Sequence, residues 1–188
     1  SREKTMEFYM TNLGGTINLL EAIRAVEINP IILVPGSSAE YGLVAKEENP
    51  INEKCLFRPI SPYGISKILQ DMVGYQYFNN YNLKIIRTRA FNITGPGERE
   101  DFVCSNFARQ IAMIEKGLQD SIIKVGNLEA KRDFTDVRDI VRGYWLAVEK
   151  GMSGEVYNIC SGKDYSTKEI LDILLSFSQI KIEIEQDP

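Results

Sequence analysis

The stretch Pro30-Ile-Ile-Leu-Val-Pro35, followed by Gly36-Ser-Ser-Ala-Glu-Tyr-Gly42, decides the fold. Its uninterrupted apolar run predicts a strand that is buried on both faces, as strands of parallel sheets are. The segment rich in glycine and serine that comes next predicts a turn. Because ligands gather at the carboxyl ends of parallel strands, this turn is also the first place to look for a site.

Helices and strands alternate on both sides of this strand. Before it, apolar residues spaced three and four apart predict a helix over 5–27. After it, we expect helices over 62–81, 102–116, 136–150 and 166–177, and strands over 83–89, 122–125, 156–159 and 180–184. Such alternation predicts an α/β fold with a doubly wound parallel sheet of the Rossmann type.

The usual opening of such a fold is not seen. Doubly wound nucleotide-binding domains begin with a strand, a glycine-rich turn and a helix that holds the cofactor pyrophosphate. Here the early glycine pair, Gly14-Gly15, lies inside the predicted first helix, so we interpret it as a site of close helix packing. We therefore expect the chain to be the C-terminal part of a longer fold, without the N-terminal glycine-rich βαβ unit.

The composition excludes several kinds of chemistry. The 188 residues suit one domain, alone or with a small lobe. They include no histidine, which excludes a Ser-His-Asp triad or a histidine-ligated zinc site built from this chain. The formal charge of −4 and the scattered basic residues do not favour nucleic acid as a partner. No apolar run approaches the ~18 residues of a membrane span. Three separated cysteines, Cys55, Cys104 and Cys160, indicate a reducing, cytoplasmic compartment.

Acid–base chemistry must then come from other side chains, and the segment Ser61-Pro-Tyr-Gly-Ile-Ser-Lys67 offers a pair. Pro62 suits a first helical turn, so Tyr63 and Lys67 project from one helix face at positions i and i+4. An ammonium beside a phenol lowers the pKa of the phenol, and such a tyrosine can exchange a proton with a substrate alcohol or ketone. Alone, the spacing is common and also fits a helix surface without a role.

A second motif makes the pair more specific. Ser37 and Ser38 follow the apolar strand, and a hydroxyl there could hydrogen-bond the same substrate oxygen that Tyr63 addresses. The alternative is a turn that satisfies its own backbone. A strand, Ser-Ser-x-x-Tyr-Gly, about twenty residues and then Tyr-x-x-x-Lys on a helix form a much rarer combination than either motif.

This order resembles the extended short-chain dehydrogenase/reductase family that acts on nucleotide sugars. Within it, the chain is most similar to the group of GDP-4-keto-6-deoxy-D-mannose reductases and GDP-mannose 4,6-dehydratases. The stretches that carry the likeness are Phe91-Asn-Ile-Thr-Gly-Pro-Gly97 with Asp101-Phe-Val-Cys-Ser105, Val125-Gly-Asn-Leu-Glu-Ala-Lys-Arg-Asp-Phe134 and Thr135-Asp-Val-Arg-Asp139. The likeness covers essentially the whole chain.

The resemblance implies a role for each candidate residue. The catalytic set would be Ser37, Tyr63 and Lys67, with NADP or NAD held by Tyr63, Lys67 and Ser38. A GDP-sugar would be bound by Glu40, Asn92, Asn127 and Arg132, with a nucleotide-sugar-binding lobe formed by roughly 92–134 and 160–188 of a single partial domain. An arginine such as Arg132 pairs bidentately with phosphate oxygens, although Lys131-Arg132 also fits a solvated turn. Relatives often dimerise through the helices that correspond to residues 6–27 and 62–81, so a homodimer is expected.

The reaction type can be argued from the same motif. Family dehydratases carry carboxylates just after the first serine or threonine, whereas Ser38 and Ala39 occupy those positions here. Glu40 would take that place only if the alignment shifts by one residue. We therefore expect NAD(P)H-dependent reduction of the 4-keto group of a GDP-6-deoxyhexose, of the type that gives GDP-D-rhamnose. The alternatives are an NDP-sugar epimerase or 4,6-dehydratase, and a non-catalytic fragment that binds a nucleotide sugar or a partner protein.

Overall fold

The computed structural model describes residues 5–186, which form two compact units. Unit 1 comprises the residues up to Phe91 together with Asp139–Ile159, and unit 2 comprises Asn92–Arg138 together with the residues from Cys160 onward. The predicted lobe over 92–134 and 160–188 thus falls within unit 2, whose first segment extends to Arg138. None of the helices in the described residues is long and apolar enough to cross a membrane.

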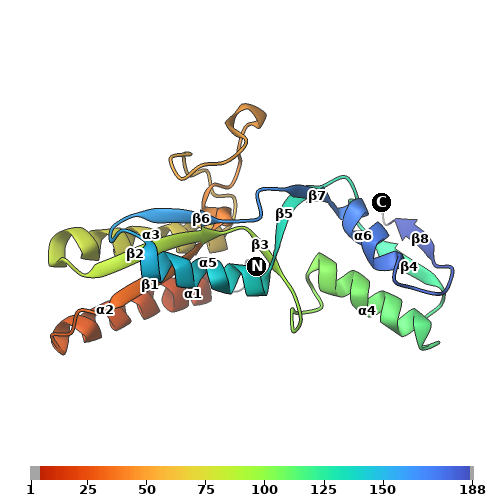
Figure 1. Cartoon of the computed structure of the whole chain (residues 1–188), viewed down its shortest axis with the longest axis horizontal. Helices are drawn as coiled ribbons and strands as arrows, with labels where there is room; N and C mark the ends of the chain where they lie inside the picture. Colours follow the sequence, from red (N-terminus) through yellow and green to blue (C-terminus); the bar gives the residue numbers. More distant parts are fainter. Residues whose placement is uncertain (1–4, 187–188) are drawn as a thin grey trace. The chain divides into compact units, whose positions relative to one another are not determined.

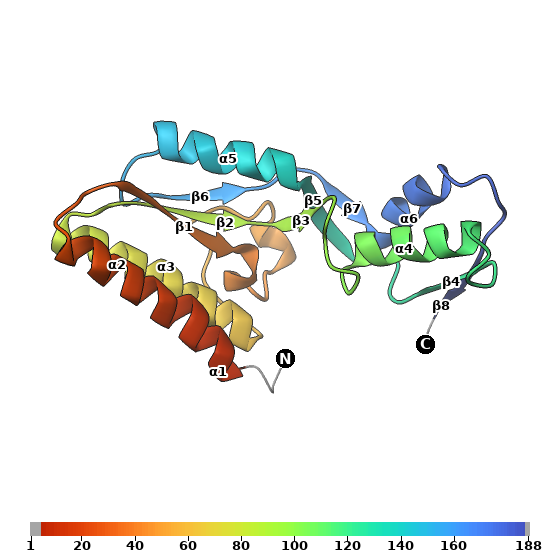
Figure 2. The same ribbon diagram turned by 90° about the horizontal axis from the view of Figure 1, so that it is seen from below.

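Unit 1 is built on a three-stranded parallel sheet in the order β1-β2-β6 (Figure 1). Its strands are β1 (Ile31–Ser37), β2 (Lys84–Ala90) and β6 (Val156–Ile159). Helices α2 (Gly15–Ala25) and α3 (Pro62–Tyr81) cover one face of the sheet and α5 (Val137–Lys150) covers the other, as Figure 2 shows. Helices on both faces of a parallel sheet confirm the predicted α/β, doubly wound architecture.

The core of unit 1 lies between α2, α3 and the sheet. It consists of buried apolar side chains from all three, namely Leu20, Ile23, Ile32, Val34, Tyr77, Leu83 and Ile85. In β1, however, buried residues alternate with exposed or half-buried ones rather than forming a strand buried on both faces. The prediction of two buried faces was wrong because only every second side chain of β1 points into this core.

The predicted first helix contains an irregular turn. A short helix α1 (Thr5–Phe8) continues into a π-helical turn over Tyr9–Gly14 and then into α2. A Cβ atom added at Gly14 or Gly15 would meet no atom of residues 5–186 within 4 Å, apart from the chain neighbours and the helix's own backbone. Close helix packing therefore does not explain this glycine pair, and that interpretation was wrong.

Unit 2 combines two small sheets with two helices. One sheet has the order β3-β5-β7 and is formed by Asn92–Thr94, Lys131–Asp136 and Asp164–Ser166. The other pairs β4 (Ile122–Val125) with β8 (Glu183–Gln186) in parallel. Helices α4 (Val103–Glu115) and α6 (Thr167–Leu175) pack with β4 around a second core, whose buried members are Phe107, Ile111, Ile114, Ile123, Val125 and Leu171.

Candidate active site

Ser37 is the last residue of β1, at the carboxyl end of a parallel strand. Its backbone N–H donates to Oε1 of Glu40 over 2.8 Å. Its hydroxyl oxygen accepts from the backbone N–H of Ala39 over 3.2 Å. The serine thus caps the 3₁₀ turn η3 (Ser38–Glu40) that follows the strand. Both the main chain and the side chain of Ser37 are held by its own turn. Ser38, the alternative candidate, lies half-buried inside the same turn.

Tyr63 lies in the first turn of α3, where the Ser61 side chain accepts from the backbone N–H of Gly64 and Pro62 begins the helix. Its side chain makes a hydrogen bond with the side chain of Ser37. Its ring packs edge-on against Phe8, with 5.7 Å between the ring centres, and 37% of the residue remains exposed. The phenol is therefore held toward Ser37, while part of the residue stays exposed to solvent.

The pKa of Tyr63 shifts opposite to the sequence-based expectation. Burial raises it above its usual value of 10, and the hydrogen bond with Ser37 opposes that rise only in part. The Lys67 ammonium instead donates to the Pro35 carbonyl over 2.7 Å and to Oε1 of Gln70 over 2.8 Å. Burial lowers the pKa of Lys67. Desolvation, rather than a neighbouring cation, thus determines the direction in which the pKa of Tyr63 shifts. The prediction of a lowered pKa was therefore wrong.

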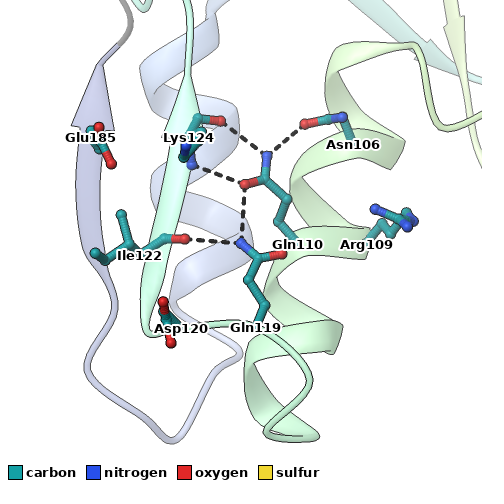
Figure 3. Close-up of a pocket in the computed structure, with 8 residues that line it drawn as sticks. All are labelled: Asn106, Arg109, Gln110, Gln119, Asp120, Ile122, Lys124 and Glu185. Atoms are coloured by element: carbon teal, nitrogen blue, oxygen red, sulfur yellow. Dashed lines mark hydrogen bonds between the residues drawn. The ribbon is translucent and has the colours of Figure 1, made fainter.

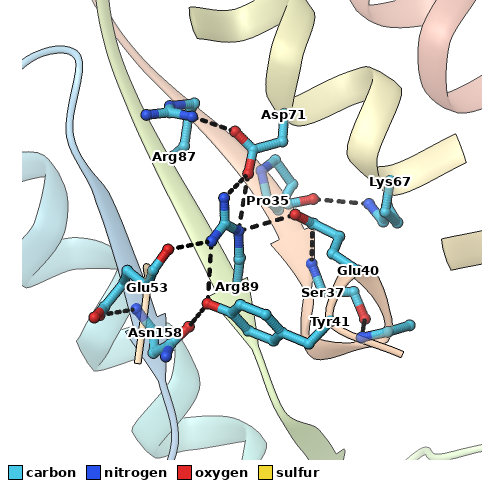
Figure 4. A network of polar contacts seen from close by, with 11 residues as sticks. Pro35, Ser37, Glu40, Tyr41, Glu53, Lys67, Asp71, Arg87, Arg89 and Asn158 are labelled. Atoms are coloured by element: carbon cyan, nitrogen blue, oxygen red, sulfur yellow. Dashed lines mark hydrogen bonds and ion pairs between the residues drawn. The ribbon is translucent and has the colours of Figure 1, made fainter. Parts of the chain in front are cut away.

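Glu40 does not lie where a substrate could reach it, and its predicted role in substrate binding is corrected. The residue has an exposed fraction of 0%, and its Oε2 atom accepts from Nε of Arg89 over 2.9 Å. Arg89 in turn binds Asp71 of α3, which also pairs with Arg87 (Figure 4). The four side chains form a buried network of two arginines and two carboxylates behind β1 and β2.

The remaining predicted residues, Asn92, Asn127 and Arg132, belong to unit 2. Arg132 lies exposed on β5 and donates to the carbonyl of Lys131 over 2.7 Å. The Lys131-Arg132 pair is thus part of a strand, and the alternative of a solvated turn was wrong. Asn127 lies in the exposed loop after β4, where its side chain accepts from the Glu129 N–H over 2.9 Å.

Asn92 contacts Asp133, a residue that was not predicted from the sequence to belong to the site. The Asn92 amide donates to the main-chain carbonyl of Asp133 over 3.1 Å. The Asp133 carboxylate accepts from the Ser161 N–H over 3.0 Å, the Ser161 hydroxyl over 2.9 Å and the Gly162 N–H over 2.7 Å. This carboxylate clamps the turn after β6 to the strand that carries Arg132. The sequence contains one sign of this role, because Asp133 directly follows the predicted site residue Arg132.

Unit 2 also contains a pocket of about 600 Å³ lined by α4, β4 and β8, which Figure 3 shows. Its wall is polar, because the buried Gln110 side chain donates to Asn106 and to the Lys124 carbonyl and accepts from the Lys124 N–H. None of the predicted site residues lines it. Among residues 5–186, no group of three or more acidic, cysteine or histidine side chains could hold a metal ion.

Comparison with known proteins places this geometry in a family. The GDP-mannose 4,6 dehydratase family matches residues 1–187. The chain belongs to this family. It is 37% identical over 177 residues to GDP-6-deoxy-D-mannose reductase of Pseudomonas aeruginosa, covering 94% of this chain and 58% of that protein. It is 32% identical over 173 residues to GDP-mannose 4,6-dehydratase of Yersinia enterocolitica, covering 91% of this chain and 45% of that one.

A solved structure shows the same fold. The structure of RMD from Pseudomonas aeruginosa complexed with NADPH superimposes with a TM-score of 0.94 and 34% sequence identity, covering 99% of this chain and 64% of that one. The family membership and the Rossmann-type fold predicted from the sequence are thus confirmed. The chain spans about half to two thirds of the length of these relatives.

Proposed function

We propose that the chain carries the catalytic residues of an NAD(P)H-dependent reductase that acts on the 4-keto group of a GDP-6-deoxyhexose. The observation that carries the proposal is the hydrogen bond between Ser37 and Tyr63 at the carboxyl end of β1. Reduction of a ketone to an alcohol needs one hydride and one proton. A fixed phenol and a hydroxyl that address one substrate oxygen can deliver that proton and stabilise the developing alkoxide.

Tyr63 carries the proton that ketone reduction requires. Burial raises its pKa, so the phenol is protonated at neutral pH. Ser37 would donate a hydrogen bond to the same oxygen. Transfer of the proton to the substrate leaves Tyr63 as a phenolate, which the hydrogen bond with Ser37 favours.

A nicotinamide cofactor, NADP(H) or NAD(H), fits the donors near this pair. Lys67 presents a half-buried ammonium already bound to the Pro35 carbonyl at the end of β1, and Ser38 adds a hydroxyl in the adjacent turn. An ammonium, a phenol and a hydroxyl are suitable partners for ribose hydroxyls. When bound, the reduced cofactor supplies the hydride. The relative complexed with NADPH supports this choice.

Reduction is favoured over elimination of water by the residues that follow Ser37. Elimination needs an acid and a base beside the sugar, and Ser38 and Ala39 supply neither. Glu40 is held by Arg89 in the buried network and has no exposed surface. The likeness to GDP-6-deoxy-D-mannose reductase, which is greater than that to GDP-mannose 4,6-dehydratase, supports the same conclusion.

Unit 2 is proposed to bind the nucleotide sugar. Arg132 is exposed and its guanidinium suits the diphosphate. Asn92 and Asn127 are amides whose polar atoms could add hydrogen bonds to the same ligand. Asp133 would support Arg132 by fixing the strand on which it lies.

The test uses the full gene product that contains this chain. Incubation with GDP-4-keto-6-deoxymannose and NADPH or NADH is expected to oxidise the cofactor and to yield a GDP-deoxyhexose that chromatography separates from the substrate. Conversion of GDP-mannose to the keto sugar without net cofactor consumption would instead indicate a dehydratase. Binding of GDP-sugar without turnover of either substrate would support the non-catalytic alternative.

A further inference from the structure

The fully buried Glu40 touches the main chain of the residue proposed to hydrogen-bond the substrate. Its Oε1 atom accepts from the Ser37 N–H over 2.8 Å, and Glu40 lies three residues later in the turn η3. Gly36 leaves room for this contact, because a Cβ atom there would lie 2.4 Å from Oε1 of Glu40 and 2.4 Å from the Thr88 carbonyl oxygen. The local sequence Gly-Ser-x-x-Glu thus encloses the carboxylate behind Ser37.

The other oxygen of this carboxylate is held from β2 and α3. Arg89 donates to it through Nε over 2.9 Å and to Asp71 through Nη2 over 2.7 Å. The remaining guanidinium nitrogen, Nη1, donates to the Tyr41 hydroxyl and to the Glu53 carbonyl, each over 3.1 Å. Figure 4 shows that these partners surround Arg89 and leave its guanidinium facing Glu40. Glu40 therefore cannot turn away from Ser37 without giving up a buried contact with Arg89.

We propose that Glu40 is a positioning residue for Ser37, an inference that rests on the proposed reductase function. The carboxylate holds the Ser37 main chain so that the hydroxyl stays directed at Tyr63. Glu40 itself touches neither substrate nor cofactor. The Glu40 charge also raises the pKa of Tyr63 and of Lys67. An effect of that kind would persist without the Ser37 hydroxyl, whereas positioning of Ser37 would not, and the double-mutant cycle below separates the two.

The chain contains a matched control. Glu48 makes the same two kinds of contact, because it accepts from the Ala45 N–H over 2.9 Å and from Arg58 over 2.6 and 2.9 Å. The residue three positions before it is an alanine outside the proposed site. Glu48→Ala thus removes a turn-capping carboxylate and its arginine contact without acting on Ser37.

The experiment is a double-mutant cycle in the full gene product, with kcat expressed per folded protein. Glu40→Ala is expected to lower kcat about 10- to 100-fold, since misplacement of a group by about 1 Å can cost that much. KM for the GDP-keto sugar should change less than about twofold. In a Ser37→Ala background, Glu40→Ala should lower kcat by less than a further factor of about two. Glu48→Ala should leave kcat within about twofold in both backgrounds.

If Glu40→Ala does not fold, Glu40→Gln takes its place in the cycle. Its one amide oxygen can accept from only one of the two donors, the Ser37 N–H and Arg89. We therefore expect a smaller loss of kcat than for Glu40→Ala when Ser37 is present, and again less than a further twofold loss in the Ser37→Ala background. The inference would be overturned by equal losses of kcat with and without the Ser37 hydroxyl, or by an unchanged kcat in the protein that retains Ser37.

Amide hydrogen exchange provides a readout that does not depend on turnover. A peptide covering 31–41 should exchange faster in the Glu40 variant, by at least about tenfold at Ser37, and should be unchanged by Glu48→Ala. Unchanged exchange at Ser37 would overturn the inference even in an active enzyme. Faster exchange in a protein that reduces no keto sugar would overturn the proposed function and, with it, the catalytic part of the inference.

Discussion

The Lys67 ammonium donates a hydrogen bond to the Pro35 carbonyl, with 2.7 Å between nitrogen and oxygen. Pro35 lies two residues before Ser37 in the same strand, β1. The contact therefore ties the second turn of α3 to the strand end that carries the serine, while Tyr63 in the first turn is tied to the serine itself. Two residues of one helix face thus hold the same strand end at two points.

The proposed acid is tested by Tyr63→Phe. The phenylalanine keeps the ring and its packing against Phe8 but loses the hydroxyl that bonds Ser37. We expect kcat for reduction to fall by about 10²- to 10⁴-fold, as is typical for loss of a general acid. Affinity for the GDP-sugar, measured by calorimetry, should stay the same. Turnover close to that of the unaltered protein would refute the assignment.

Arg132→Ala separates substrate binding from chemistry. Arg132 is exposed on β5, and its only proposed contact is with phosphate. A phosphate contact acts on the ground state and the transition state alike, so KM should rise while kcat stays nearly constant. Steady-state kinetics over a range of GDP-keto sugar concentrations measure both. Lys131→Ala, one residue away, is the control, and an equal rise of KM in both variants would indicate a general effect of charge.

The buried carboxylate of Glu40 predicts a pH dependence of stability. Burial, aided by the negative charge of Asp71, raises its pKa above the usual 4.5, although the Ser37 N–H and the charge of Arg89 act in the opposite direction. The folded state then holds a proton to a higher pH than the unfolded state does, so the contribution of this group to stability is lost as the pH rises from about 4.5 through the pKa of the folded state. Glu40→Gln cannot ionise and should show a flatter profile. Urea denaturation across this range tests it, and parallel profiles would contradict the expectation.

Two glycines in helices should respond to alanine in opposite ways. At Gly15 the backbone is helical and an added Cβ atom meets nothing within 4 Å in the part of the chain that the structure describes, so Gly15→Ala should stabilise the protein by about 0.5–1 kcal/mol. At Gly64 an added Cβ atom would lie 2.6 Å from the Ala39 carbonyl oxygen. Gly64→Ala should therefore destabilise it by about 1–3 kcal/mol. Denaturation midpoints of the two variants are compared, and shifts of the same sign would be inconsistent with this packing.

The elements around Ser37 and Tyr63 were predictable because each has a strong local signal. An uninterrupted apolar run specifies β1, and a capping serine followed by proline specifies the start of α3. The carboxyl end of one and the amino end of the other then meet, as they do in parallel α/β folds.

The surroundings of Glu40 were not predictable in this way. Arg89, which holds it, lies 49 residues away in sequence, and no local pattern indicates which buried carboxylate an arginine will find. The short strands β3, β5 and β7 were not predicted from the sequence for a related reason. Each has few apolar residues, and pairing with partners distant in sequence determines its conformation. The direction of the Tyr63 pKa shift depends on burial, which the spacing of Tyr63 and Lys67 does not reveal.

The clamp made by Asp133 has a consequence for biogenesis. It joins the two chain segments of unit 2, which are separated in sequence by most of α5 and all of β6. During synthesis, Asp133 leaves the ribosome 28 residues before Ser161, so its carboxylate at first lacks the contacts that join the two segments. Leu171, which completes the second core, emerges later still. Unit 2 therefore assembles last, and until then its apolar surface on α4 and β4 is exposed to chaperones and to aggregation.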